Sequence, residues 1–190
     1  MPPKSKFTRE EILEMAMEIV QELGMEAVTA RELGKSLGSS ARPIFTVFEN
    51  MEEVHQEIMR KAKALYREYV KEGLSQEIAF KGVGIAYIRF AQEEPKLFQL
   101  LFMQEKDEVK NLDEVLSSIE ESYDEILASV QEAYGLEPSI AKKLYQHLWI
   151  YTHGIATLCA TKVCNFTVEE ISNMVSEVFM GLIIKIKSGK

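Results

Sequence analysis

The sequence predicts an all-α protein with two parts, on three observations. Apolar residues recur at helical spacing along nearly the whole chain, and no segment alternates as a half-buried strand does. A Thr followed three residues later by Glu, which predicts a capped helix start, occurs at Thr8, Thr29 and Thr167. Short helices crowd the first fifty residues and longer ones follow. We therefore expect a small three-helix unit joined to a larger helical body.

The first three helices are expected at residues 8–24, 29–37 and about 40–48. Gly24 ends the first, and the Gly38-Ser39-Ser40 stretch breaks the second. Pro43 is tolerated only in the first turn of a helix, which places the start of the third near Ser40.

The body is expected to contain five further helices and one aromatic short one. Gly73 and Gly135 are expected to end two of them, and residues 103–110 read as a loop. The expected ranges are 51–72, 76–93, a short helix from Pro95 through Phe102, 111–134, 138 to about 163, and a last helix from the Thr167 cap to about Lys187.

Composition excludes several protein classes. With 190 residues, 46% hydrophobic and 27% charged, the chain suits a folded globular protein rather than a disordered one. The formal charge of −8 argues against nonspecific coating of nucleic acid or anionic membrane. Two cysteines cannot build a disulfide framework, the start lacks the apolar run of a signal peptide, and residues 148–160 are too short to span a bilayer. We expect a cytoplasmic protein without membrane contact.

Residues 29–48 have the proportions of a helix-turn-helix, whose second helix enters the major groove of DNA. The start of that second helix carries hydrogen-bond donors at Ser39, Ser40, Arg42 and Thr46. Backbone N–H groups at Thr29 and the next two residues suit phosphate. The full set of candidate DNA contacts is Lys6, Thr29, Ala30, Arg31, Ser39, Ser40, Arg42, Pro43, Phe45 and Thr46.

The charge of this region leaves an alternative open. Residues 1–50 hold six basic and eight acidic side chains, a net −2, whereas residues 28–48 are net +2 and the tail adds further basic residues, Arg9 among them. The alternative is a helical protein-interaction module that has lost DNA binding. An Arg42→Ala variant discriminates the two.

Residues 24–33, residues 37–48 and the acidic start Glu52-Glu53-Val54 resemble the TetR/AcrR family of transcriptional regulators. The resemblance implies a DNA-binding domain at 6–66, with the helix-turn-helix at 29–48, and a C-terminal effector-binding and dimerisation domain at 67–190. It further implies a homodimer on a pseudo-palindromic operator of double-stranded DNA, most often a repressor released by a small-molecule ligand.

Two residues depart from the family pattern. The family usually has Tyr where Phe45 stands, with its hydroxyl on a phosphate, and favours Lys where Met51 stands. Losing two phosphate contacts per subunit should weaken DNA binding and lower its salt dependence.

The resemblance places dimerisation on the last two helices. The sequence permits this because both helices are apolar on more than one side; burial of these faces inside a monomer is the other interpretation.

Trp149, His153 and Gly154 resemble a Trp-x-x-x-His-Gly pattern of one branch of the family, and we interpret His153 as a hydrogen-bonded core residue. A small apolar or aromatic effector is expected among aromatic side chains that would equally suit a core. These are Tyr87, Phe90, Phe98, Phe102, Tyr123, Trp149 and His153.

The sequence indicates neither an enzyme nor a bound metal or cofactor. It has no Gly-rich phosphate loop and no His-Glu-x-x-His motif, and its Glu pairs stand at helix starts. Cys159 lies six residues after His153, a poor spacing for two ligands on one helical face.

Overall fold

The computed structural model describes residues 6–105, 108, 110–119 and 122–188. Within those residues the chain is helical and contains no strand, so the predicted all-α class is confirmed. Two compact units form, Met1–Leu65 with Lys96–Gln104 and Tyr66–Pro95 with Glu105–Lys190. The helix α3 (Met51–Leu74) belongs to the first unit at its start and to the second at its end.

The first unit contains α1 (Arg9–Leu23), α2 (Ala30–Ser36), the start of α3 and most of α5 (Pro95–Phe102). Both predicted caps are present, since Thr8 forms a capping box with Glu11 and the Thr29 hydroxyl accepts the Glu32 N–H at 3.2 Å. A short 3-10 turn, η1 (Met25–Ala27), links α1 to α2. The buried side chains of this unit include Ile12, Ala16, Leu33, Ile44, Phe48, Ile58, Leu97 and Phe98.

The third helix expected at residues 40–48 is wrong in type and length. Arg42 and Pro43 form a turn, and only Ile44–Thr46 is helical, as the 3-10 turn η2. Pro43 lacks an N–H and disfavours a helical conformation at Arg42. The Thr46 hydroxyl donates to the Pro43 carbonyl at 2.6 Å, a local bond that competes with a regular helix.

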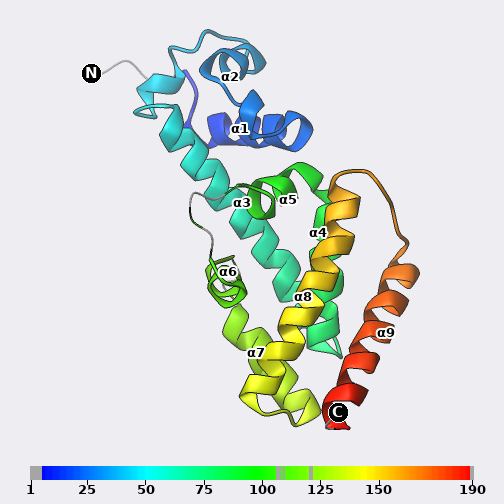
Figure 1. Ribbon diagram of the computed structural model, residues 1–190. Coiled ribbons are helices and arrows are strands. Elements are labelled where there is room, and N and C mark those ends of the chain that lie inside the picture. Colours follow the sequence, from blue (N-terminus) through cyan, green and yellow to red (C-terminus); the bar gives the residue numbers. More distant parts are fainter. Residues whose placement is uncertain (1–5, 106–107, 109, 120–121, 189–190) are drawn as a thin grey trace. The chain divides into compact units, whose positions relative to one another are not determined.

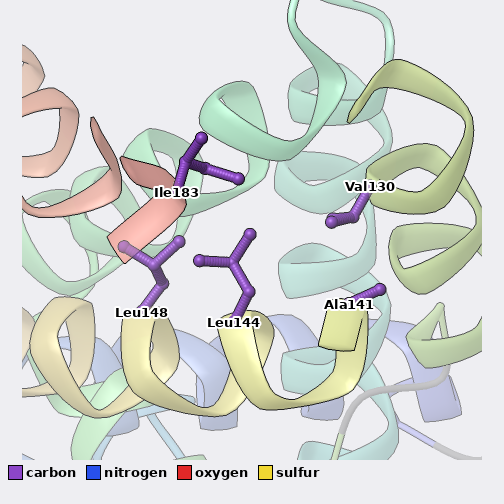
Figure 2. Close-up of a cluster of buried hydrophobic side chains, with 5 residues drawn as sticks. All are labelled: Val130, Ala141, Leu144, Leu148 and Ile183. Carbon is purple, nitrogen blue, oxygen red and sulfur yellow. The ribbon is translucent and has the colours of Figure 1, made fainter. Parts of the chain in front are cut away.

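The second unit contains the end of α3 and five other helices, with α4 packed along α8 and also touching α7 and α9 (Figure 1). Their bounds are α4 (Ala79–Glu93), α6 (Leu112–Ile119), α7 (Tyr123–Tyr134), α8 (Pro138–Ala160) and α9 (Val168–Lys187). Figure 2 shows one buried cluster in which Ala141, Leu144 and Leu148 of α8 face Val130 of α7 and Ile183 of α9.

The helix starts and ends of this unit test the remaining expectations. The last helix agrees with its prediction, and Thr167 and Glu170 form its capping box. The single helix expected at 111–134 is wrong, because α6 and α7 are separate and Ser122 is non-helical, with φ −93° and ψ 17°. The acidic first turn of α7, Asp124 and Glu125, suits a helix start, which apolar spacing alone does not reveal.

Two other boundaries also shift. Gly73 lies inside α3 instead of ending it, and α4 begins at Ala79 rather than Gln76. Helix α8 ends at Ala160, three residues early, and Lys162 then has the left-handed φ of 58°. None of the described helices combines the length and apolar character needed to cross a membrane.

Candidate functional site

The candidate DNA surface is the set of ten residues named above, from Lys6 to Thr46, all in the first unit. The side chains of Arg31, Ser40, Arg42 and Thr46 are exposed, and Phe45 is 46% exposed. The Lys6 ammonium donates to Ser39 Oγ at 3.2 Å, which brings the N-terminal arm to the turn. Ala30, Ser39 and Pro43 are half-buried, and Thr29 is exposed. The structure thus gathers the cations of Lys6 and Arg42 around one turn, together with the hydroxyls of Ser39, Ser40 and Thr46.

One expected phosphate donor is already used within the chain. The Thr29 N–H donates to the Ala27 carbonyl at 2.9 Å, so this amide does not point free toward a ligand as expected. Its hydroxyl is also occupied, because it caps α2. Thr29 therefore shapes the start of α2, and the cations at positions 6, 31 and 42 carry the positive charge of the surface.

Gly34 fixes the turn, and sequence reasoning missed it. A Cβ on Gly34 would lie 2.9 Å from Ala41 N and from Ser40 C, so the turn backbone passes directly over α2 at this residue. The Ser39 N–H donates to the Gly34 carbonyl at 2.8 Å, and Gly38 has φ 62°. The signal was present in the sequence, since a Gly inside a short helix indicates close backbone approach.

Arg9 holds the other end of the turn and is not part of a free basic tail. Its guanidinium pairs with Glu53 at 2.7 Å and Glu57 at 2.5 Å, donates to the Val47 carbonyl at 3.2 Å, and lies 4.2 Å from the Phe48 ring centre. The hydrogen bond that the Glu53 carboxylate accepts from the Glu49 N–H lowers the pKa of Glu53 below its ordinary value. The hydrogen bond from the Arg9 guanidinium is the second cause. The expectation that Arg9 adds to the DNA-facing charge is therefore wrong.

A cavity of about 210 Å³ lies in the second unit, between helices α3, α4, α7, α8 and α9. Its walls are largely aromatic, and one charged side chain, Lys81, lines it. The aromatic members are Tyr66, Phe80, Tyr87, Tyr134, Tyr145, Trp149 and Phe179. An apolar hollow with few polar groups suits a small molecule.

Of the seven residues predicted to line a pocket, Tyr87 and Trp149 do so. Phe90 is fully buried against Tyr66 and Tyr69, and the Tyr123 ring lies 5.5 Å from that of Tyr145. Phe98 and Phe102 pack together in the first unit, with ring centres 5.1 Å apart. The pocket prediction for Phe90, Phe98, Phe102, Tyr123 and His153 is therefore not supported by the position of the cavity. Sequence spacing could not separate these core residues from the walls.

His153 stands behind the cavity wall. Its ring stacks on Trp149 at 4.7 Å with an interplanar angle of 12°, and its Nδ1 lies 2.9 Å from the Tyr87 hydroxyl. Burial lowers the pKa of His153 below its ordinary value. The contacts agree with a positioning role for His153, since both partners line the cavity.

The described residues bring no three His, Cys, Asp or Glu side chains together in a way that could hold a metal ion. Cys159 is buried and Cys164 is exposed, both as free thiols.

Helices α8 and α9 also expose apolar side chains, which form what we call the α8–α9 apolar face. On α8, Ile150 and Leu158 are exposed on either side of Gly154. On α9, Met180 and Ile184 are exposed around Gly181. A Cβ on either glycine would meet open space, so another helix could approach closely there.

A family model described as the tetracyclin repressor-like C-terminal domain matches residues 80–176, just over half of the chain. The chain belongs to the TetR family. This TetR-family protein is therefore a transcriptional regulator.

A solved structure, described as fatty acid degradation regulator FadR from Bacillus halodurans, has a fold similar to that of this TetR-family chain. The TM-score is 0.56 at 18% sequence identity, covering 93% of this chain and 98% of that one. At this identity the likeness shows a shared fold. The comparison of this chain with curated proteins found no match.

Proposed function

We propose that this transcriptional regulator is a homodimeric, sequence-specific DNA-binding repressor that a small molecule in the cavity releases from its operator. The observation that carries the proposal is the exposed turn of the first unit, where Arg42, Ser40 and Thr46 face solvent on a backbone held by Gly34 and Arg9. Such a rigid polar turn can place a guanidinium against guanine O6 and N7. The FadR comparison supports the regulatory role through fold alone.

Dimerisation would come from the α8–α9 apolar face. Exposed apolar side chains around Gly154 and Gly181 suit self-complementary packing of two helix pairs about a twofold axis. Two reading heads on such a dimer would bind half-sites of a pseudo-palindrome about one helical turn, or a multiple of it, apart.

The cavity supports ligand control because α3 reaches it. Tyr66 of α3 lines the cavity, and α3 begins at Met51, three residues after Phe48 at the end of the turn segment. A ligand that binds one position of α3 better than another shifts the protein between states of different DNA affinity.

The test is selection of genomic fragments by the purified protein, followed by titration of the best fragment at two salt concentrations. Arg42→Ala should weaken binding by about 1–3 kcal/mol and relax the preference at one base pair. The matched control is Lys143→Ala, which removes an exposed cation from α8 in the second unit and should leave DNA affinity unchanged.

A second candidate is the protein-interaction module without DNA binding. The observation that favours it is the single 3-10 turn, with Phe45 exposed, in place of a regular recognition helix. Retention of no fragment at low salt, with a folded dimer in the same preparation, would support this module against the repressor.

A further inference from the structure

The described walls of the cavity in the second unit include one cationic side chain and no acidic one. Lys81 of α4 is the one charged side chain among its described walls, and within the described part of the chain its ammonium forms no ion pair. The side chain is half-buried at the first turn of α4, next to the wall residue Phe80. A cation without a counter-ion in the wall of an apolar hollow favours an anionic ligand group.

Three other polar groups of the wall are already used inside the chain. The Thr152 hydroxyl donates to the Leu148 carbonyl at 3.0 Å, and the Ser176 hydroxyl donates to the Ser172 carbonyl at 2.6 Å. The Tyr87 hydroxyl lies 2.9 Å from His153 Nδ1. Lys81 is therefore the strongest donor that the wall offers to a guest, and a single cation matches a single anionic group.

An adjoining hollow has the opposite charge. It shares Ile78, Phe80 and Tyr134 with the cavity and adds the exposed carboxylates Glu77 and Glu132. A ligand carboxylate beside those glutamates would be repelled, whereas beside the Lys81 ammonium it would be paired. The charges of the described walls thus favour an anionic end at Lys81 and an apolar body in the aromatic interior.

The size and lining of the interior define the body of the ligand. The volume of about 210 Å³ exceeds the roughly 150 Å³ of an engineered apolar cavity that binds benzene. Gly84 widens the middle of the α4 wall, where a Cβ would reach within 3.5 Å of Thr152 Cγ2. The rings of Tyr66 and Trp149 offer faces and edges for an aromatic or alkyl body.

We propose that the cavity selects an apolar monocarboxylate about as large as a phenyl ring with a short chain, with its carboxylate paired to Lys81. This inference rests on the proposed function only in taking the bound acid to be the effector; binding of the acid is a separate property of the second unit.

The test uses 4-phenylbutyrate with its matched alcohol, 4-phenylbutanol, and its matched amine, 4-phenylbutylamine. Trp149 is the one tryptophan of the chain and lines the cavity, so its fluorescence reports binding directly. The acid should bind wild type at least about tenfold more tightly than the alcohol or the amine, which is about 1.4 kcal/mol. Decanoate in the same titration distinguishes a straight-chain acid from an aryl acid.

Lys81→Gln should abolish the preference for the acid while leaving binding of the alcohol within about twofold, because the aromatic interior is intact. Lys143→Gln, an exposed lysine of α8 outside the cavity wall, should behave as wild type. Equal affinity for acid and alcohol, tighter binding of the amine, an unchanged preference in Lys81→Gln, or no saturable binding of any probe would overturn the proposal.

DNA titration of the same preparations separates the two proposals. Binding of the acid by a protein that retains no DNA supports this inference and refutes the repressor. Acid binding that leaves operator affinity unchanged also supports this inference, and refutes the acid as effector. Specific DNA binding without selection of the acid refutes the inference alone.

Discussion

His153 is a basic side chain whose environment favours its neutral form. It is half-buried, stacked on Trp149 and within hydrogen-bond distance of the Tyr87 hydroxyl. Burial lowers its pKa from the ordinary value of 6.5. Because the unfolded chain binds a proton that the folded chain resists, the neutral histidine stabilises the fold above about pH 6.5, and this stability is lost as the pH falls through the lowered pKa.

We therefore expect the free energy of unfolding of wild type to fall more steeply below about pH 6.5 than that of His153→Gln. Gln keeps an acceptor for the Tyr87 hydroxyl but has no titrating group. The excess slope should approach about 1.4 kcal/mol per pH unit at most. Urea unfolding at several pH values between 5 and 8 measures it. Parallel pH profiles for the two proteins would contradict the lowered pKa, because they would show that His153 binds its proton equally well in the folded and the unfolded chain.

At the scale of elements, the sequence predicts best where a local rule fixes a boundary. Thr8 and Thr167 define the starts of α1 and α9 because a capping side chain acts within one turn. The break before α7 and the collapse of the third helix to η2 depend on competition between nearly equal local conformations, which apolar spacing does not measure. The residues that line the cavity are harder still to predict. Phe80 and Phe90 of α4 have the same chemistry, yet Phe80 lines the cavity and Phe90 packs against Tyr69, because different neighbours meet α4 at the two positions.

The crossing of α3 and α4 depends on two glycines, Gly73, which was expected to end its helix, and Gly82. A Cβ on Gly73 would lie 2.7 Å from Val83 Cα, and a Cβ on Gly82 would collide with the Gly73 carbonyl oxygen. Arg89 pairs with Glu72 at 2.8 and 2.5 Å beside this crossing. The two helices therefore approach closely because no side chain separates their backbones.

Gly82→Ala should destabilise the protein by about 1–3 kcal/mol, since backbone rather than a flexible side chain blocks the added methyl group. Gly84→Ala, two residues along the same helix, is the matched control. There the new Cβ would meet only Thr152 Cγ2 at 3.5 Å, so the gain in helix propensity of about 0.5–1 kcal/mol should dominate. Urea unfolding of both variants checks the pair, and equal effects would contradict the close crossing.

At the scale of the whole molecule, the proposed repressor needs two copies of the chain. The α8–α9 apolar face exposes Ile184 to 63% and Ile150 to 55% in a single chain, with open space over Gly154 and Gly181. Large apolar side chains grouped around small residues on two neighbouring helices are typical of a helix-pair interface. Because a twofold interface uses the same patch on both copies, one charged substitution introduces two charges into it.

Ile184→Glu should therefore convert the dimer to a monomer, measured by light scattering after size exclusion, without loss of helix content. Val163→Glu is the control, because Val163 is 68% exposed but lies after the end of α8 and outside the face. A monomer binds one half-site at a time, so its operator affinity should fall by about 100-fold or more, whereas the control keeps both dimer and affinity. A dimeric Ile184→Glu protein with wild-type operator affinity would place the subunit contact elsewhere. A monomer with full affinity would show instead that each head recognises DNA alone, which removes the requirement for a palindrome.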